Sequence, residues 1–464
     1  MIRNWLYMRV IRKDGAFDFP QGEAGNRIGL LPKENLMTDR SSMPPNGSNS
    51  GPLAAPLMPN KPWLRRVLAI SGPGIVVMLA DTDAGSIITA AQSGAQRGYT
   101  LLLLQLILIP ILFVVQELTV RLGVVTHRGH GELILERFGR GWAWLSVSTL
   151  AIACIGALVS ELSGLAGVGL LFGIPAWQTM VLVIGGLVSI VWTASYRSVE
   201  RIAIVFGALE LLFIWIAWRA HPDGHAMARA LLHIPLADHD YLYLATANIG
   251  AVIMPWMVFY QQSAVIEKDM NREHLNALRW ETAVGAVITQ LVMIGVLVAT
   301  AATIGRVHAN TPLDTVQEIS GALTPFLGSE LGRAVFALGM SGAAIVATIV
   351  VSLTAAWGVG EVAGYRRSLA DHPLEAPWFY GIFTLCLVLA GVLVASGTNL
   401  VTLSVGVQVL NAMLLPIVLG FLFALAARAL PHSDRLKGGY TLIAGTVMFI
   451  TAAFGIYAAL TGAV

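Results

Sequence analysis

The chain has 464 residues, of which 56% are hydrophobic and 12% charged, and its mean hydropathy is +0.71. A typical soluble domain is about 45–50% apolar and about 25% charged, and a globule of this size could not bury so much apolar surface. The composition therefore excludes an ordinary soluble enzyme and a largely disordered chain, and it predicts a polytopic membrane protein. The net charge of +2 gives no electrostatic footprint for nucleic acid. Cys154 and Cys386 both lie in apolar runs, so we expect neither a disulfide nor a cysteine-based metal site.

Residues 1–62 differ in composition from the rest of the chain. The segment contains the run SSMPPNGSNSG from Ser41 to Gly51, which cannot form a buried core. No apolar stretch of about 7–15 residues follows its basic start, so a secretory signal is a poor fit. We predict a disordered cytoplasmic N-terminal tail over 1–62 and a transmembrane domain over 63–464, although a translation start at Met43 or Met58 fits the tail equally well.

Eleven apolar segments follow the tail, each long enough to cross a bilayer, which takes about 20 residues. They lie near 64–92, 99–122, 142–171, 178–195, 199–218, 241–266, 280–304, 331–358, 377–397, 400–427 and 440–461. All are expected to be α-helices, because lipid offers no hydrogen-bond partner to exposed backbone groups.

The distribution of Lys and Arg predicts the orientation of these spans. Loops on the side of the N-terminus contain Arg121, Arg128, Arg137, Arg140, Arg197, Arg201, Lys268, Arg272, Arg279, Arg366, Arg367, Arg428, Arg435 and Lys437. The opposite loops contain Arg97, Arg219, Arg229, Arg306 and Arg333. The positive-inside rule then predicts a multi-pass protein of the cell inner (plasma) membrane with a cytoplasmic N-terminus. The two long outer loops, 219–240 and 305–330, are expected to be solvated connections.

The first span carries two acidic residues at membrane depth. Asp81 and Asp83, in the stretch GPGIVVMLADTDAGS, lie in the middle of the span and are followed by Gly85 and Ser86. A carboxylate at that depth costs at least about 2.5–3.5 kcal/mol on insertion scales, so both need a reason. Gly85 is the expected point of a helix break that directs carboxylates and free carbonyls into a cavity. Structural pairing with another helix is the alternative, and it has more weight for Asp81 than for Asp83.

The sixth span is expected to break near Ala251–Pro255. Pro255 lacks the backbone N–H of the helical ladder, and its ring clashes with the preceding turn. Met254, otherwise an ordinary packing residue, lies at this break. Interrupted helices in corresponding positions of two halves are typical of inverted-repeat transporters that bind their substrate near the middle of the membrane.

At these two breaks the chain resembles the NRAMP family of divalent-metal transporters. DAGS, from Asp83 to Ser86, stands where the family has Asp-Pro-Gly-Asn, and GAVIMPWM, from Gly250 to Met257, lines up with its Ala-x-x-Met-Pro-His-Asn motif. The stretches GAQRGYTLL, VQELTVRLGVVT, LLFGIP and YRSVERI also resemble the family, and the similarity is thinner toward helices 8 to 11.

The resemblance implies an all-α integral membrane protein with a LeuT-like fold of 11 transmembrane helices, in which helices 1–5 and 6–10 are inverted repeats and helices 1 and 6 are broken. It also implies a metal site made by Asp83, Ser86, the carbonyl of Ala251 and the thioether of Met254. Carboxylate and carbonyl oxygens suit any divalent cation, whereas a thioether favours softer, later metals.

The sequence departs from the family's motifs in several places. The hydroxyl of Ser86 replaces the longer asparagine amide, and Ala84 replaces proline. Trp256 and Gln262 replace two histidines, the side chains best suited to titrate near neutral pH. The arginines at the start of helix 9 have no counterpart between Pro373 and Cys386. This pattern resembles the NRAMP-related magnesium/manganese transporter branch, which handles partly hydrated ions.

We therefore expect a secondary transporter, not an enzyme, that imports Mn²⁺ and Mg²⁺, and less readily Fe²⁺, by alternating access without histidine-based proton coupling. The metal is the cargo, no cofactor is expected, and the chain is expected to act as a monomer in the lipid bilayer without nucleic acid. One alternative is a proton-coupled Mn²⁺/Fe²⁺ symporter of the histidine-containing NRAMP type. Another is a cation-coupled symporter for a small organic solute, which the two acidic residues at the helix 1 break disfavour.

Six further polar or aromatic positions are candidates for a secondary ion pathway: Asp81, Trp256, Gln262, Glu161, Gln408 and Asn411. Glu161 resembles the family's helix 3 glutamate if one gap is allowed, and it either relays charge or protons or pairs with another helix. Gln408 and Asn411 either reach the ion cavity or form hydrogen bonds between packed helices.

Other polar residues are given structural roles. Glu210 and Gln290 are expected to form hydrogen bonds between helices, and Glu117 is expected to form a cytoplasmic-side salt bridge with Arg121. His130 lies in the polar stretch THRGHGE, for which we expect a solvated loop.

Overall fold

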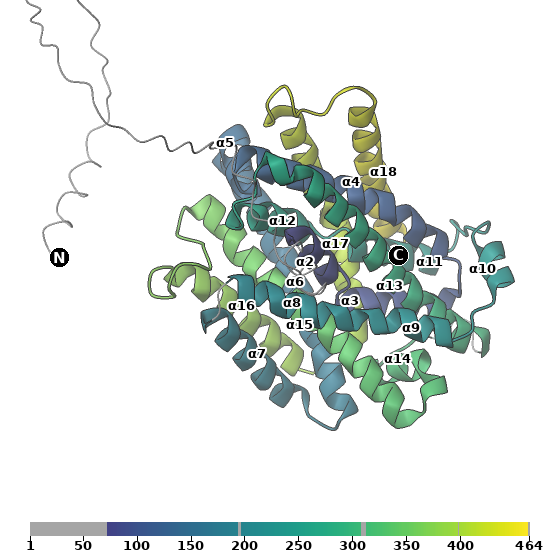
Figure 1. Cartoon of the computed structure of the whole chain (residues 1–464). Helices are drawn as coiled ribbons and strands as arrows, with labels where there is room; N and C mark the ends of the chain where they lie inside the picture. Colours follow the sequence, from purple (N-terminus) through teal and green to yellow (C-terminus); the bar gives the residue numbers. More distant parts are fainter. Residues whose placement is uncertain (1–71, 194–195, 308–311, 398, 463–464) are drawn as a thin grey trace, which may run out of the picture. The chain divides into compact units, whose positions relative to one another are not determined.

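The computed structural model describes residues 72–193, 196–307, 312–397 and 399–462, and in these ranges all regular elements are helical (Figure 1). The predicted tail over 1–62 and the beginning of the first predicted span lie outside the described residues. Among the described residues, ten helices are long and apolar enough to cross a membrane, and a bent pair of shorter helices makes an eleventh span. The predicted number of spans is therefore confirmed.

The spans follow one another in the predicted order. Their bounds are α2 (Pro73–Asp81) with α3 (Ala84–Arg97), α4 (Leu102–Thr126), α6 (Arg140–Leu171), α7 (Ala176–Thr193), α8 (Tyr196–Gly207) with η1 (Ala208–Leu211) and α9 (Leu212–Arg219), α11 (His239–Val252) with α12 (Pro255–Glu267), α13 (Leu275–Val307), α15 (Ser329–Ala363), α16 (Pro377–Ala395), α17 (Leu400–Arg428) and α18 (Gly438–Gly462). Shorter elements connect them: α5 (His130–Phe138), α10 (Gly224–Ala230), η2 (Arg272–His274), α14 (Val316–Leu323) and η3 (Pro325–Leu327).

The first span is broken at Thr82 and Asp83, where α2 and α3 meet at an angle of 45°. Asp83 is extended (φ −81°, ψ 174°), and its Oδ1 accepts a 2.6 Å hydrogen bond from the backbone N–H of Ser86. This is the usual N-cap geometry of an aspartate. The predicted break at Gly85 was therefore wrong by two residues, since Gly85 lies in the first turn of α3. A Cβ at Gly85 would lie 2.1 Å from Gln408 Nε2, so this glycine allows a close approach instead of a turn.

The sixth span is interrupted where the proline predicts it. Ile253 and Met254 leave the helical conformation, and Pro255 is the first residue of α12, a position at which a missing N–H costs nothing. The predicted break near Ala251–Pro255 is confirmed.

The two broken spans lie at the centre of the helices. Of an apolar 18-residue stretch in the span from His239 to Glu267, 94% is buried within the protein. The corresponding share is 17% in α7 and 22% in α18. α2 packs against α13, α15 and α8, and α11 packs against α17, α18 and α3 (Figure 1). The weakly buried outer helices therefore face lipid, and the polar residues of the breaks are surrounded by other helices.

The long loops differ from each other. α10, in the loop 219–240, has no fully buried residue, as a solvated connection predicts. The described part of 305–330 instead contains α14, whose Val316, Ile319 and Leu323 are buried. Their spacing gives the helix an apolar face that packs on α13, α15 and α6. Gln92 of α3 also exchanges hydrogen bonds with the backbone of Leu313, so the prediction of a merely solvated loop was wrong here.

Candidate functional site

Ser86 connects the two breaks. Its hydroxyl donates a 2.9 Å hydrogen bond to the carbonyl oxygen of Ala251, while its backbone N–H binds Asp83. In an unbroken helix the Ala251 carbonyl would accept from the residue four positions later. That residue is Pro255, which has no N–H, so the sequence itself frees this carbonyl. One short side chain thus joins an acidic N-cap on one broken helix to a freed carbonyl on the other.

The groups at the breaks are closed off from solvent. Asp83, Ser86 and Ala251 are 0% exposed and Met254 is 1% exposed. Asp83 Oδ2 has no hydrogen-bond partner. The Met254 sulfur accepts a 3.2 Å hydrogen bond from Trp256 Nε1. The structure therefore presents a closed conformation, and an ion can reach these residues only after a rearrangement of the helices.

Glu161 of α6 lies beside Asp83. Its Oε2 accepts a 3.0 Å hydrogen bond from the backbone N–H of Ala84, the first residue of α3, and its Oε1 has no partner. Neither Lys nor Arg occurs among the fully buried residues of the described ranges. Glu161 is therefore not half of a buried salt bridge, and its carboxyl group faces that of Asp83.

Gln408 and Asn411 of α17 lie at the same crossing. Asn411 donates a 2.9 Å hydrogen bond to Gln408 Oε1, which leaves Gln408 Nε2 and Asn411 Oδ1 without partners. A Cβ at Gly85 would meet Gln408 Nε2, and a Cβ at Gly250 would meet the Gln408 carbonyl at 1.8 Å. Gln408 therefore touches both broken helices.

Two further buried acidic residues accompany this group. Asp81 ends α2 and is 1% exposed, and neither of its carboxylate oxygens has a hydrogen-bond partner. Glu210, on η1, is also 1% exposed, and its carboxylate interacts with the hydroxyl of Thr82 on the first span. The prediction of a hydrogen bond between helices was therefore wrong for Gln290, whose amide has no partner, but not for Glu210. The sequence does point to Glu210 as a candidate functional residue, because Glu210 is the one charged residue in the apolar run 202–218.

His130 was also predicted wrongly. It is 0% exposed, its ring packs edge-on against Phe259 with centroids 4.8 Å apart, and its Nδ1 lies 3.2 Å from Gln262 Oε1. The Gln262 amide nitrogen donates to the carbonyl of Arg128 at 2.7 Å, so its oxygen faces His130 and accepts. Gln262 thus binds the end of α5 and does not join the groups around Asp83. Burial lowers the pKa of His130 to about 4, so the ring is neutral at physiological pH.

This buried histidine predicts a pH dependence of stability. Unfolded histidine takes up a proton near pH 6.5, and the folded chain does so only near pH 4, so the free energy of unfolding falls as the pH falls between those values. The full effect of this one residue is about 3 kcal/mol. We expect His130→Gln to lose less thermal stability than the wild type between pH 7 and pH 4.5, measured by melting in detergent. His233→Gln, in an exposed loop, should follow the wild type, and parallel curves for all three proteins would contradict the prediction.

Glu117 forms the predicted salt bridge. Its Oε1 accepts from Arg121 at 2.6 Å and from Arg279 at 2.8 Å, and its Oε2 accepts from the Tyr440 hydroxyl at 3.0 Å. This cluster ties α4 to α13 and α18, and it lies apart from the breaks.

The breaks offer a mixed set of donors for a cation. No three His, Cys, Asp or Glu residues in the described ranges lie close enough together to hold a metal. A cation at the breaks would therefore rely on one carboxylate, Asp83, together with neutral donors from Ser86, Ala251 and Met254. Four protein donors leave room for water on an ion that prefers about six ligands.

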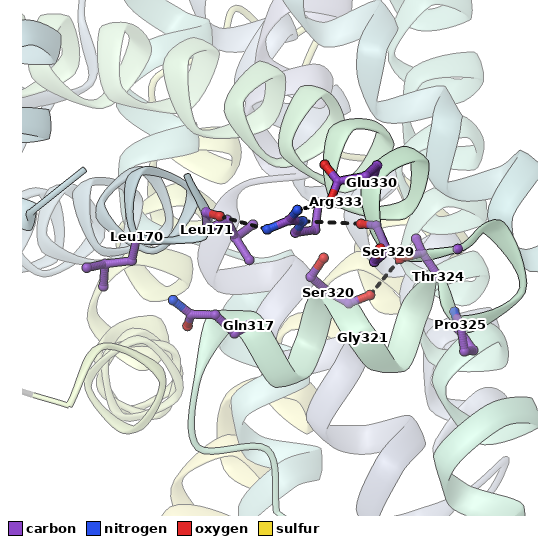
Figure 2. Close-up of a pocket in the computed structure, with 11 residues that line it drawn as sticks. Leu170, Leu171, Gln317, Ser320, Gly321, Thr324, Pro325, Ser329, Glu330 and Arg333 are labelled. Carbon is purple, nitrogen blue, oxygen red and sulfur yellow. Dashed lines mark hydrogen bonds and ion pairs between the residues drawn. The ribbon is translucent and has the colours of Figure 1, made fainter. Parts of the chain in front are cut away.

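A separate cavity of about 490 Å³ lies between the end of α6, α14, η3 and the start of α15. Figure 2 shows Arg333 at its edge, bonded to the carbonyls of Leu171 and Ser329, with Gln317 and Ser320 of α14 lining the wall. None of the predicted metal-site residues lines this cavity.

The broken first and sixth helices and the order of the eleven spans define a LeuT-like membrane transporter fold. A solved manganese transporter of Eremococcus coleocola has this fold, with a TM-score of 0.68, 18% identity and coverage of 86% of this chain and 88% of that one. MhsT, solved with L-phenylalanine, also shares it, with a TM-score of 0.60 at 13% identity and coverage of 84% and 98%.

The sequence comparisons then give the family. The model "Natural resistance-associated macrophage protein-like" (Nramp) matches residues 74–461, and the chain belongs to this family. The divalent metal cation transporter MntH of Yersinia pestis is 29% identical over 300 residues, which cover 62% of this chain and 72% of that protein. The protein of the same name from Xanthomonas campestris is 28% identical over 307 residues, covering 63% and 68%. The family and the fold predicted from the sequence are confirmed.

Proposed function

We propose that this protein carries divalent metal cations across the membrane by alternating access, with Mn²⁺ and Mg²⁺ as the main cargo and Fe²⁺ as a weaker one. The observation that supports this most directly is the meeting of Asp83, Ser86 and the freed Ala251 carbonyl between two broken helices, closed off from both sides. Rocking of the broken helices against the others would open the site to one side at a time. The names of the MntH relatives and of the Eremococcus coleocola transporter support a divalent metal cargo, which in the second name is manganese.

In the proposed site, Asp83 supplies the charged ligand through its unpartnered Oδ2. The Ala251 carbonyl becomes available when the Ser86 hydroxyl rotates toward the ion, so that both oxygens bind. The Met254 sulfur keeps a lone pair beside its hydrogen bond from Trp256. Oxygen donors dominate, which suits Mg²⁺, and Mn²⁺ accepts the thioether as well.

Coupling to protons through histidine is not part of the proposal. Trp256 and Gln262 stand where the family has histidines, and the nearest histidine to Gln262 is the buried, neutral His130. With its pKa lowered to about 4, His130 would not exchange protons in the pH range in which histidine-based coupling operates.

We further propose that the N-terminus is cytoplasmic, that residues 1–62 form a tail and that the protein acts as a monomer.

An organic solute is the weaker alternative. Carriers of this fold hold a substrate carboxylate at helix N-termini in the break. Here Asp83 caps the N-terminus of α3, and Glu161 binds the same turn. Two acidic groups already use the donors that a carboxylate substrate would need, and they would repel it.

The test is uptake of labelled Mn²⁺ by proteoliposomes that contain an internal pH dye. We expect Mn²⁺ to enter, excess Mg²⁺ to reduce its entry, and the internal pH to follow that of protein-free vesicles. Absence of Mn²⁺ entry would refute the proposal. Internal acidification in step with Mn²⁺ entry would instead support the proton-coupled alternative.

A further inference from the structure

The centre of the protein contains more acidic side chains than the proposed metal site uses. Four carboxylates, those of Asp81, Asp83, Glu161 and Glu210, are buried there. Glu210 lies within electrostatic range of Asp81 and Asp83, and Glu161 lies within range of Asp83 and Glu210. Among the described residues no buried Lys or Arg offsets them. When all four groups are ionised, a divalent ion at Asp83 balances two of the charges and leaves two others.

Asp81 and Glu210 are the pair that the proposed metal site does not use. Both oxygens of Asp81 are buried without hydrogen-bond partners, and the Glu210 carboxylate is buried beside the Thr82 hydroxyl. Leaving such charges buried and unpaired costs several kcal/mol each. Thr82, between Asp81 and Asp83, is also buried, and its hydroxyl is the donor that faces Glu210. Among the described residues, the four carboxylate oxygens of Asp81 and Glu210 thus have this one hydroxyl as a side-chain donor.

The backbone at this place also favours a cation. α2 has nine residues and ends at Asp81. The last carbonyls of a helix lack intrahelical partners, and the negative end of the helix dipole lies there. The facing surface is closely packed, since a Cβ at Gly207, next to η1, would lie 2.7 Å from Leu79 Cδ1. The region between α2 and η1 therefore combines two carboxylates, a hydroxyl oxygen and the carbonyls of a helix C-terminus, and all of these oxygen atoms can bind a cation.

We propose that Asp81, Thr82 and Glu210 form a second cation site, between the end of α2 and η1, that takes a small monovalent cation such as Na⁺. Hard oxygen donors without nitrogen or sulfur suit this class of ion. A monovalent ion is preferred over a second divalent one because it repels the neighbouring cargo ion half as strongly at the same distance. The site adjoins the proposed metal site, because Thr82 directly precedes Asp83 in the chain.

The experiment measures thermal unfolding of the purified full-length protein in detergent. Na⁺ is titrated against choline at constant chloride, and Mn²⁺ is titrated in a parallel series. We expect Na⁺ to raise the melting temperature of the wild type in a saturating manner, by roughly 2 °C or more. Glu210→Gln and Asp81→Asn, which keep the shape of each side chain, should lose this rise.

Two further variants separate this site from other causes. Asp83→Ala should keep the Na⁺-dependent rise and lose the Mn²⁺-dependent one, whereas Glu210→Gln should show the reverse. Glu361→Gln is the matched control, because Glu361 is a buried carboxylate that is already satisfied by Ser263 at 2.6 Å and the Gly131 N–H at 2.7 Å. It should respond to Na⁺ like the wild type.

The second-site proposal is overturned if the wild type shows no Na⁺ response, or if Glu210→Gln and Asp81→Asn respond as it does. Asp81→Asn decides the matter if Glu210→Gln cannot be purified. A missing Mn²⁺ response with a normal Na⁺ response would count against the proposed function alone.

Discussion

Replacing Asp83 with alanine is expected to abolish divalent-metal uptake while leaving the protein folded. Asp83 offers the charged oxygen that lies unpartnered between the two breaks, and the other proposed ligands are neutral. Without it, the ion would exchange its water shell for a carbonyl, a hydroxyl and a thioether with no charge to offset the loss. We expect initial Mn²⁺ uptake into proteoliposomes to fall at least about 100-fold, equivalent to about 2.7 kcal/mol.

Folding must be checked separately in this variant. Asp83 also caps α3, and losing such a cap costs about 1 kcal/mol of stability. Removing the Asp83 carboxyl group also relieves the burial of two acidic groups side by side, Asp83 and Glu161, which offsets this loss. The melting temperature should therefore change little. Asp83→Asn, which retains a capping oxygen, should also lose uptake, while Asp314→Ala removes an exposed carboxylate and should transport normally. Uptake by Asp83→Asn at the rate of the wild type would show that the carboxylate charge is not a ligand.

The sequence predicts the architecture well because bilayer thickness and backbone hydrogen bonding leave few choices. A run of about 20 apolar residues must be a helix, and Pro255 must interrupt the sixth one. The first break was harder to place. Both Asp83 and Gly85 can end a helical segment, and the aspartate does so through its bond to Ser86, while the glycine serves the contact with Gln408.

The residues that sequence reasoning misplaced depend on contacts between distant segments. His130 stands in a stretch of polar residues, and it is buried because α5 packs against Phe259 and Gln262, more than a hundred residues later. Glu210 was assigned a partner on another helix because buried carboxylates usually have one. That partner is the Thr82 hydroxyl on the first span, and Asp81 and Asp83 lie nearby, an arrangement that a single sequence does not reveal.

Gly250 controls how closely α11 and α17 approach, and Gly250→Ala is expected to damage both stability and transport. A Cβ at this position would lie 1.8 Å from the Gln408 carbonyl oxygen and 2.8 Å from the Ala412 nitrogen. Both are backbone atoms within α17, so they cannot rotate away, and the two helices must move apart. Overpacking of this kind costs about 1–3 kcal/mol or more, which should lower the melting temperature measurably.

The same displacement should reach the proposed metal site, because Gly250 precedes Ala251 and Gln408 also contacts the first turn of α3. We therefore expect Gly250→Ala to reduce Mn²⁺ uptake at least tenfold in proteoliposomes with equal protein content. Gly406→Ala is the matched control, since a Cβ there meets no atom within 4 Å on the same helix α17. It should melt at or slightly above the wild-type temperature, because alanine is the better helix former, and it should transport normally. If Gly250→Ala behaved like this control, the close contact between α11 and α17 would not persist in the working transporter, and the link from Gln408 to both breaks would have to be abandoned.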